Sequence, residues 1–300
     1  MTSAPTTRVT YSNVNDDFSA VQDWLDSRRP AFEGSLGGRF PNVIGGADDS
    51  DGEAYEVRSP IDTDIVLGHF VDASDAAVKR AVAAARAAQP AWAARPWQER
   101  VSILRWVADR LAEHKYELTL AAIYEVGKSR MEALGEVEEA VDLARFFADE
   151  MERNQGYGRE LKRALPNERT ASVMRPYGVF GVIAPFNFSV ALSVKMMSPA
   201  LVAGNTVVFK PSEGGGLTGS WLMRCFNEGG LPAGVLNMVC GEQAGPRLVD
   251  ADGVAGIAFT GSHEVGMSIY RQFAVGPYAR PVIAEMGGKN PAYVTASADL

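Results

Sequence analysis

Cysteine and histidine are scarce in this sequence. Its 300 residues include two cysteines, Cys225 and Cys240, and three scattered histidines. Two cysteines cannot build a disulfide framework, and so low a number fits a reducing, cytoplasmic compartment. Because no Cys/His cluster stands at metal-ligand spacing, we expect no metal site.

Long apolar runs and basic tracts are missing as well. No stretch approaches the ~20 apolar residues that span a bilayer, and the polar residues 1–15 lack the apolar core of a signal peptide. Acidic and basic residues are interspersed, with a formal net charge of -8. We therefore expect neither a membrane nor a nucleic acid among the partners.

Residues 1–158 are predicted to be mainly helical. Ser74 can cap a helix that Pro90 is expected to end, and a long helix is predicted over residues 130–153. The acids of this long helix crowd its N-terminal half. We interpret them as a solvated face rather than as metal ligands, because no histidine joins them. These acids are Glu132, Glu136, Glu138, Glu139 and Asp142.

The helical pattern breaks at residues 159–176. Residues 161–164 and 170–174 are strand-like and a Pro-Asn-Glu turn separates them, so a hairpin is predicted. Two interpretations are open. The hairpin can pair with another subunit through its edges, or it can be an ordinary surface hairpin.

Residues 177–286 show five strand patterns that alternate with four helix patterns. This alternation predicts an α/β fold, a Rossmann-like parallel sheet with helices on both faces. Gly-x-Gly-x-x-Gly is absent after the first strand, but ligands of such sheets still bind where the strands end. The predicted strands are 179–184, 206–210, 235–239, 256–259 and 282–285.

Polar groups follow several of these strands. Glu285 closes an apolar run (281–284) that is expected to be a buried strand, and two glycines come soon after. This acid can be a catalytic carboxylate or a solvated strand end. Asn187, after the first strand, can donate to a developing oxyanion or form a turn.

Two stretches can bind a dinucleotide. Glu213, just after the second strand, can accept from a ribose 2′-hydroxyl and would repel a 2′-phosphate, which favours NAD over NADP. A polar turn capped by Ser212 is the alternative. Residues 260–266 enter a helix whose free N–H groups can meet a pyrophosphate, and Ser262 can cap the same helix. Neither Cys225 nor Cys240 has the electropositive, accessible surroundings of a nucleophile.

Six motifs in this order resemble the aldehyde dehydrogenase superfamily, from about residue 40 onward. Other stretches, at 59–63, 125–128 and 283–291, are most similar to 1-pyrroline-5-carboxylate (glutamate semialdehyde) dehydrogenases. The six motifs are Pro-Phe-Asn-Phe at 185–188, the stretch 199–205, Lys-Pro-Ser-Glu at 210–213, and the stretches 230–235, 259–266 and 285–289.

The resemblance implies NAD-dependent oxidation of an aldehyde to an acid through a cysteine thioester. The implied substrate is L-glutamate γ-semialdehyde or 1-pyrroline-5-carboxylate, as in proline catabolism. Glu285 would be the general base, Asn187 the oxyanion donor, and the hairpin at 159–176 the oligomerisation element of a homodimer or homotetramer. The residues implied for cofactor contact are Ala184, Pro185, Phe186, Lys210, Ser212, Glu213, Gly245, Thr260, Gly261, Ser262, Val265, Gly266, Met286 and Gly287.

The sequence departs from the family's pattern at several positions. Ser189 replaces a common proline and His263 a frequent threonine. Met196 stands where many members have a lysine, with Lys195 one position earlier. The family's catalytic cysteine lies beyond the position of Glu285. We therefore expect residues 287–300 to begin a truncated catalytic domain, and the chain to be a fragment without its nucleophile that does not oxidise aldehydes.

Three alternatives to this expectation stay open. The chain can be a non-catalytic NAD-binding or interaction module. It can be an enzyme that uses Cys240, in which case Cys240→Ser would abolish activity. It can belong to a dehydrogenase of aromatic or other aliphatic aldehydes.

Overall fold

The computed structural model describes residues 8–10, 13, 16–276 and 278–299. Parts of three predicted segments, 1–158, 177–286 and 287–300, therefore lie outside the described residues, including most of the polar stretch 1–15. No helix among the described residues is long and apolar enough to cross a membrane.

A parallel sheet forms the centre of the molecule, as the alternating pattern predicts. Its strands run in the order β10-β9-β8-β11-β12, so the first strand of the run lies in the middle and later strands are added on both sides. The strands are β8 (Val179–Ile183), β9 (Thr206–Lys210), β10 (Leu236–Met238), β11 (Val254–Thr260) and β12 (Val282–Glu285).

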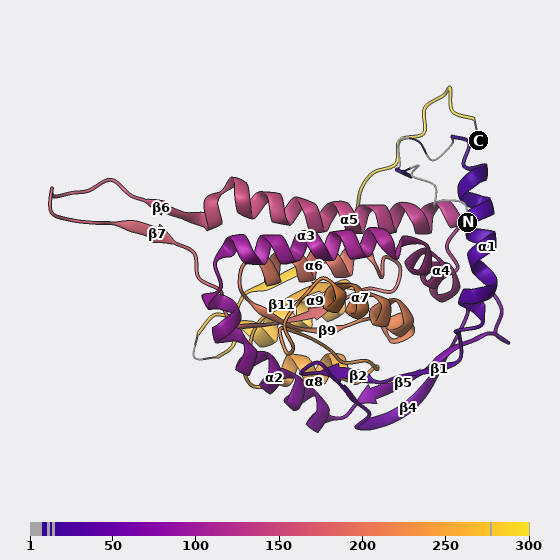
Figure 1. The fold of residues 1–300 in the computed structure, drawn as a ribbon, viewed down its shortest axis with the longest axis horizontal. Helices are drawn as coiled ribbons and strands as arrows, with labels where there is room; N and C mark the ends of the chain where they lie inside the picture. Colours follow the sequence, from indigo (N-terminus) through magenta and orange to yellow (C-terminus); the bar gives the residue numbers. More distant parts are fainter. Residues whose placement is uncertain (1–7, 11–12, 14–15, 277, 300) are drawn as a thin grey trace.

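Helices cover both faces of this sheet because its strands are apolar on both sides. Phe180 and Val182 of β8 join the core beneath α6 and α7, whereas Val179 and Ile183 join the core beneath α2, α8 and α9. Figure 1 shows α3 and α5 as a further layer over α6. The helices are α2 (Asp75–Ala94), α3 (Trp97–Glu113), α5 (Arg130–Arg153), α6 (Ala191–Val202), α7 (Gly216–Glu228), α8 (Ala244–Asp250) and α9 (His263–Ala274).

The N-terminal segment, which is predicted to be mainly helical, also contributes five strands among the described residues. β2 and β3 extend the central sheet beyond β10 in antiparallel fashion. A second sheet, β1-β5-β4, packs with α1 and α4 around a separate apolar cluster. These elements are α1 (Ser19–Glu33), β1 (Gly38–Phe40), β2 (Asn42–Ile44), β3 (Ala47–Asp49), β4 (Gly52–Arg58), β5 (Val66–Ala73) and α4 (Lys115–Val126).

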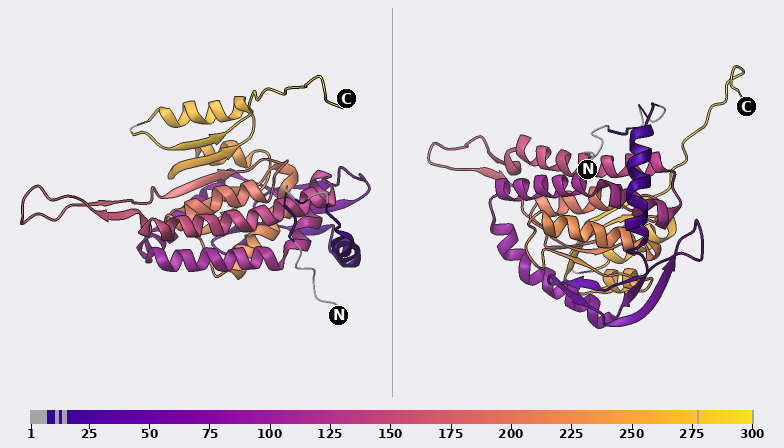
Figure 2. Two further views of the ribbon diagram at one scale, coloured as in Figure 1. Left: turned by 90° about the horizontal axis from the view of Figure 1, so that it is seen from above. Right: turned by 45° about the vertical axis from the view of Figure 1, so that its right-hand side comes forward.

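A hairpin forms where one is predicted, but its first strand precedes the predicted residues 161–164. After a 3-10 turn (Gln155–Tyr157), β6 (Gly158–Glu160) pairs with β7 (Ala171–Val173) in antiparallel register. Figures 1 and 2 show the hairpin projecting well beyond the helices and the central sheet. In the same views, the segment after β12 leaves the body of the molecule at the other end.

The prediction that Pro90 ends a helix is wrong. α2 continues through this exposed proline to Ala94. Two residues later, the buried Trp92 donates from its indole Nε1 to the carbonyl of Leu201, at 3.0 Å. Burial and this hydrogen bond hold the last turn in place, so tertiary packing outweighs the lost backbone bond of the proline.

Candidate functional site

The carboxyl ends of the central strands bring most of the predicted site residues to one edge of the sheet. Thr260 of β11 lies in register with Glu285 of β12, and Ile183 of β8 with Lys210 of β9. The backbone N–H of Gly261 donates to the carbonyl of Glu285 at 3.1 Å. The strand order reverses between β8 and β11, and ligands of open α/β sheets bind at such a reversal.

Glu285 ends an edge strand, not a buried one. Among the described residues β12 pairs on one side only, with β11, and its Ile283 is 64% exposed, so the expectation of a buried strand is wrong. The carboxylate of Glu285 is 56% exposed and lies 2.9 Å from the ammonium of Lys195 on α6. Met196 instead turns into the core, where the hydroxyl of Thr260 donates to its sulfur at 3.7 Å.

Asn187 lies in an exposed turn between β8 and α6, at the same edge of the sheet. A buried carboxylate supports this turn from the opposite side. Glu136 of α5 accepts from the backbone N–H groups of Val190 at 2.8 Å and Ala191 at 3.1 Å, at the start of α6. Negative charge is stabilised at a helix N-terminus, so Glu136 fixes where α6 begins.

A lysine completes the support beneath the Asn187 turn. Lys128 donates to the second oxygen of Glu136 at 2.7 Å and lies 3.7 Å from the ring centroid of Phe188. The predicted solvated face is therefore wrong for Glu136, which is 0% exposed, and for Glu138, which is buried against Lys115. Glu136 lies about one helical turn from Ala133 and from Ala140, which are both buried. This spacing in the sequence indicates that Glu136 faces the core.

The ammonium of Lys210 and the hydroxyl of Ser212, at the end of β9, make no hydrogen bond or ion pair with other described residues. Burial lowers the pKa of the Lys210 ammonium, and among the described residues no carboxylate pairs with it. The buried hydroxyl of Ser212 also has no hydrogen-bond partner in the described chain. Gly245 of α8 lies against the Lys210 stem, and Glu213 is exposed beside them. Such groups fit the hydroxyls of a ribose.

The start of α9 supplies further donors at this edge. Ser262 caps the helix by accepting from the N–H of Val265 at 3.3 Å, which leaves the N–H groups of His263 and Glu264 without intrahelical partners. The N–H groups of His263 and Glu264 can therefore donate to a bound anion.

Packing accounts for two glycines of this region. A Cβ at Gly261 would lie 2.6 Å from the ring of Phe259, and one at Gly266 would lie 2.5 Å from the sulfur of Met286. The ring of Phe259 therefore occupies the space where a side chain at position 261 would lie.

The remaining predicted cofactor residues flank this edge. Ala184 is buried and donates from its backbone to the carbonyl of Lys210 at 3.1 Å. Pro185 is half-buried, and Phe186 exposes its ring next to Asn187. Gly287 lies in the exposed segment after β12, where nothing approaches its Cβ position within 4 Å.

Both cysteines are unsuited to nucleophilic attack. Burial raises the pKa of the Cys225 thiol to about 12, and that of the Cys240 thiol to about 12 as well. Cys240 follows β10 and is 1% exposed, and Cys225 lies inside α7 at 0%. A thiol that stays protonated and buried cannot act as the attacking thiolate.

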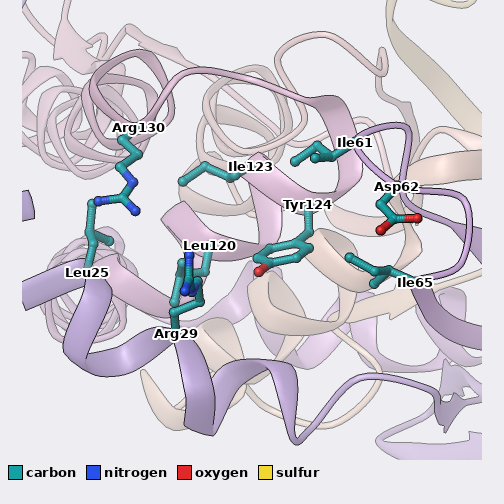
Figure 3. A pocket seen from close by; sticks show the side chains of 9 residues that line it. All are labelled: Leu25, Arg29, Ile61, Asp62, Ile65, Leu120, Ile123, Tyr124 and Arg130. Atoms are coloured by element: carbon teal, nitrogen blue, oxygen red, sulfur yellow. The ribbon is translucent and has the colours of Figure 1, made fainter.

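Two cavities differ in whether they contain residues of the predicted site. The larger, of about 710 Å³, runs between α5, α6, the base of the hairpin and β12, and its lining includes Thr260 and Glu285. The smaller, of about 300 Å³, lies between α1, α4 and the turn before β5 (Figure 3). It contains none of the predicted site residues, and its Arg130 is held by Asp26 and Gln22.

Comparison with known proteins agrees with this architecture. The sequence model of the aldehyde dehydrogenase family matches residues 47–300. The chain belongs to the aldehyde dehydrogenase family. Alpha-ketoglutaric semialdehyde dehydrogenase of Bacillus subtilis (strain 168) is 38% identical over 255 residues, which are 83% of this chain and 51% of the relative.

Solved structures of the family share the fold. The 1-pyrroline-5-carboxylate dehydrogenase of Thermus with bound NAD has a TM-score of 0.87 at 30% identity, over 96% of this chain and 57% of that one. The NADP-dependent glyceraldehyde-3-phosphate dehydrogenase from Bacillus halodurans C-125, complexed with NADP, has a TM-score of 0.79 at 33% identity, over 87% and 55%. This chain thus spans about half the length of the relatives it matches.

The buried contacts of Glu136 generate the first prediction. Glu136→Gln keeps the shape of the side chain but leaves the Lys128 ammonium buried beside a neutral amide, so the free energy of unfolding should fall by about 3 kcal/mol. Urea unfolding measures the change. The matched control is Glu152→Gln on the same helix, which removes an exposed pair with Arg105 and should cost less than about 1 kcal/mol. Equal stability of Glu136→Gln and wild type would contradict the conclusion that the Glu136 carboxylate holds the start of α6 in place.

The cysteine environments generate the second prediction. At pH 8 the native chain should be alkylated by iodoacetamide at least ~100-fold more slowly than the same chain in urea, because both thiols are buried and protonated. Mass spectrometry of peptides containing Cys225 and Cys240 measures the two rates separately. Rapid labelling of native Cys240 would restore it as a candidate nucleophile.

Proposed function

We propose that this chain supplies the cofactor-binding part and the general base of an NAD-dependent aldehyde dehydrogenase. One observation carries the proposal: Glu285, Thr260, Lys210 and the open start of α9 share one edge of a parallel sheet where its strand order reverses. We assign residues 177–286 to the cofactor-binding core and residues 287–300 to the start of a catalytic domain.

NAD would accept the hydride that leaves the aldehyde carbon. Lys210, Ser212 and Glu213 would hold its adenosine ribose, and the first-turn N–H groups of α9 would hold its pyrophosphate. Support comes from the unpartnered ammonium of Lys210 and the orphaned hydroxyl of Ser212 among the described residues. The acid at Glu213 favours NAD, because it would repel the 2′-phosphate of NADP.

Glu285 would act as the base that activates the thiol or the hydrolytic water, and Asn187 would donate to the oxyanion. The oxidation would proceed through a cysteine thioester. Because both cysteines of this chain are buried with raised thiol pKa values, we propose that the nucleophile comes from residues outside these 300. The chain alone should then bind cofactor without oxidising an aldehyde.

The proposed substrate is a short aldehyde that carries a carboxylate. The relative from Bacillus subtilis is named for alpha-ketoglutaric semialdehyde and the Thermus structure for 1-pyrroline-5-carboxylate, and both names denote a carboxylated compound. We also propose that the hairpin of β6 and β7, whose exposed apolar side chains include Val173 and Met174, joins subunits into a homodimer or homotetramer.

Cofactor selectivity provides the test. Wild-type chain should bind NAD more tightly than NADP, and Glu213→Gln should raise NADP affinity about tenfold, a change of ~1.4 kcal/mol, because it removes a negative charge from the 2′-phosphate position. Titration calorimetry measures both affinities. Glu160→Gln, an exposed acid of the hairpin, is the matched control and should change neither. If the wild-type chain binds neither NAD nor NADP, the proposed function is wrong.

A further inference from the structure

The acid proposed to bind the adenosine ribose stands on a turn with little stiffness of its own. Glu213 begins a 3-10 turn (Glu213–Gly215), and glycines follow it at positions 214, 215 and 216. Glycine loses more conformational freedom on folding than any other residue, so a run of three does not hold its own shape. The position of Glu213 therefore depends on contacts with other parts of the chain.

Glu125, near the end of α4, holds the segment that follows these glycines. The residue before α7 is Gly215, which has no side chain to cap the helix. The Glu125 carboxylate takes this role from outside. It accepts from the backbone N–H of Leu217 at 2.6 Å, from that of Thr218 at 3.1 Å, and from the Thr218 hydroxyl. Negative charge is stabilised at a helix N-terminus, so these contacts tie the first turn of α7 to α4.

Tyr55 of β4 holds the turn from a second side. Its hydroxyl donates to the backbone carbonyl of Glu213 at 3.2 Å. Burial raises the pKa of this hydroxyl, so it stays protonated and remains a donor. The ring of Tyr55 packs on Phe70 of β5 with 5.8 Å between centroids, and Phe70 fills the space where a Cβ at Gly216 would lie. The sheet β1-β5-β4 therefore lies directly against the start of α7.

We propose that Tyr55 and Glu125 are positioning residues for cofactor recognition, which hold Glu213 where its carboxylate accepts from the 2′-hydroxyl of the adenosine ribose. This inference rests on the proposed function, since it takes Glu213 as the ribose ligand. Both residues act through the backbone: Tyr55 binds the carbonyl of Glu213 itself, and Glu125 binds the helix that begins three residues later. The sheet β1-β5-β4 thereby takes part in cofactor selectivity.

Loss of either contact should affect the ribose more than the rest of the cofactor. Lys210 and the N–H groups at the start of α9 belong to other elements and do not depend on the glycine turn. A displaced Glu213 therefore removes the contribution of the 2′-hydroxyl and leaves the pyrophosphate contacts in place.

Discrimination between NAD and its analogue without the adenosine 2′-hydroxyl tests the inference. In titration calorimetry, wild type should bind NAD about tenfold more tightly than this 2′-deoxy analogue, because the analogue lacks a hydrogen bond to a charged group. Tyr55→Phe and Glu125→Gln should each lower the ratio to about threefold or less. Tyr55→Phe keeps the ring on Phe70, so it tests the inference even if Glu125→Gln does not fold.

Tyr124→Phe is the matched control. Tyr124 belongs to the apolar cluster against which Tyr55 packs, and its hydroxyl donates to the carboxylate of Glu33. This variant loses a phenol hydrogen bond of the same cluster away from Glu213, so the ratio should stay at about tenfold. A change in the ratio thus reports positioning of Glu213 rather than a general loss of stability.

A double-mutant cycle tests whether Tyr55 acts through Glu213. Glu213→Ala should bring the ratio to about one, and adding Tyr55→Phe to this variant should not weaken NAD binding further. The inference is overturned if Tyr55→Phe keeps the wild-type ratio, if Tyr124→Phe lowers it as much, or if Tyr55→Phe weakens NAD binding equally with and without Glu213.

The wild-type titrations separate this inference from the proposed function. If wild type binds NAD but shows no preference over the 2′-deoxy analogue, or if both variants keep that preference, the positioning role is wrong and the proposed function stands. If wild type binds neither NAD nor NADP, the proposed function fails, and the role of Tyr55 and Glu125 fails with it.

Discussion

A buried carboxylate at the start of α6 organises this region of the molecule. Glu136 reaches from α5 to two backbone N–H groups of α6 and is neutralised by Lys128, which also contacts Phe188. One side chain thereby links α5 to the start of α6 and supports the turn that carries Asn187. A buried ion pair can do this only because all of its charge is matched by donors.

The position of α6, which Glu136 holds, also determines contacts at the carboxyl edge of the sheet. α6 carries Lys195, which reaches Glu285 on β12, while the register of β11 and β12 sets Thr260 beside the same acid. The groups of this edge come from segments that are distant in sequence. Their proximity follows from parallel strands that all end at one side of the sheet.

The fold was largely predictable, because strand and helix periods in residues 177–286 alternate cleanly and each strand is apolar on both faces. Sequence patterns also predict a hairpin and place Glu285, Thr260 and Lys210 at strand ends. Local patterns do not predict the structure where tertiary contacts outweigh them. Pro90 lies inside a helix because Trp92 is anchored to α6, Glu136 is buried because α6 offers it two donors, and Ile283 is exposed because β12 is an edge strand.

The contact between Gly266 and Met286 has a mechanical consequence. The side chain of Met286 lies directly against the backbone of α9, since a Cβ at Gly266 would come within 2.5 Å of its sulfur. The residue after Glu285 is thus interlocked with the helix whose first turn is proposed to hold the cofactor. This contact constrains the spacing between the acid and the start of that helix.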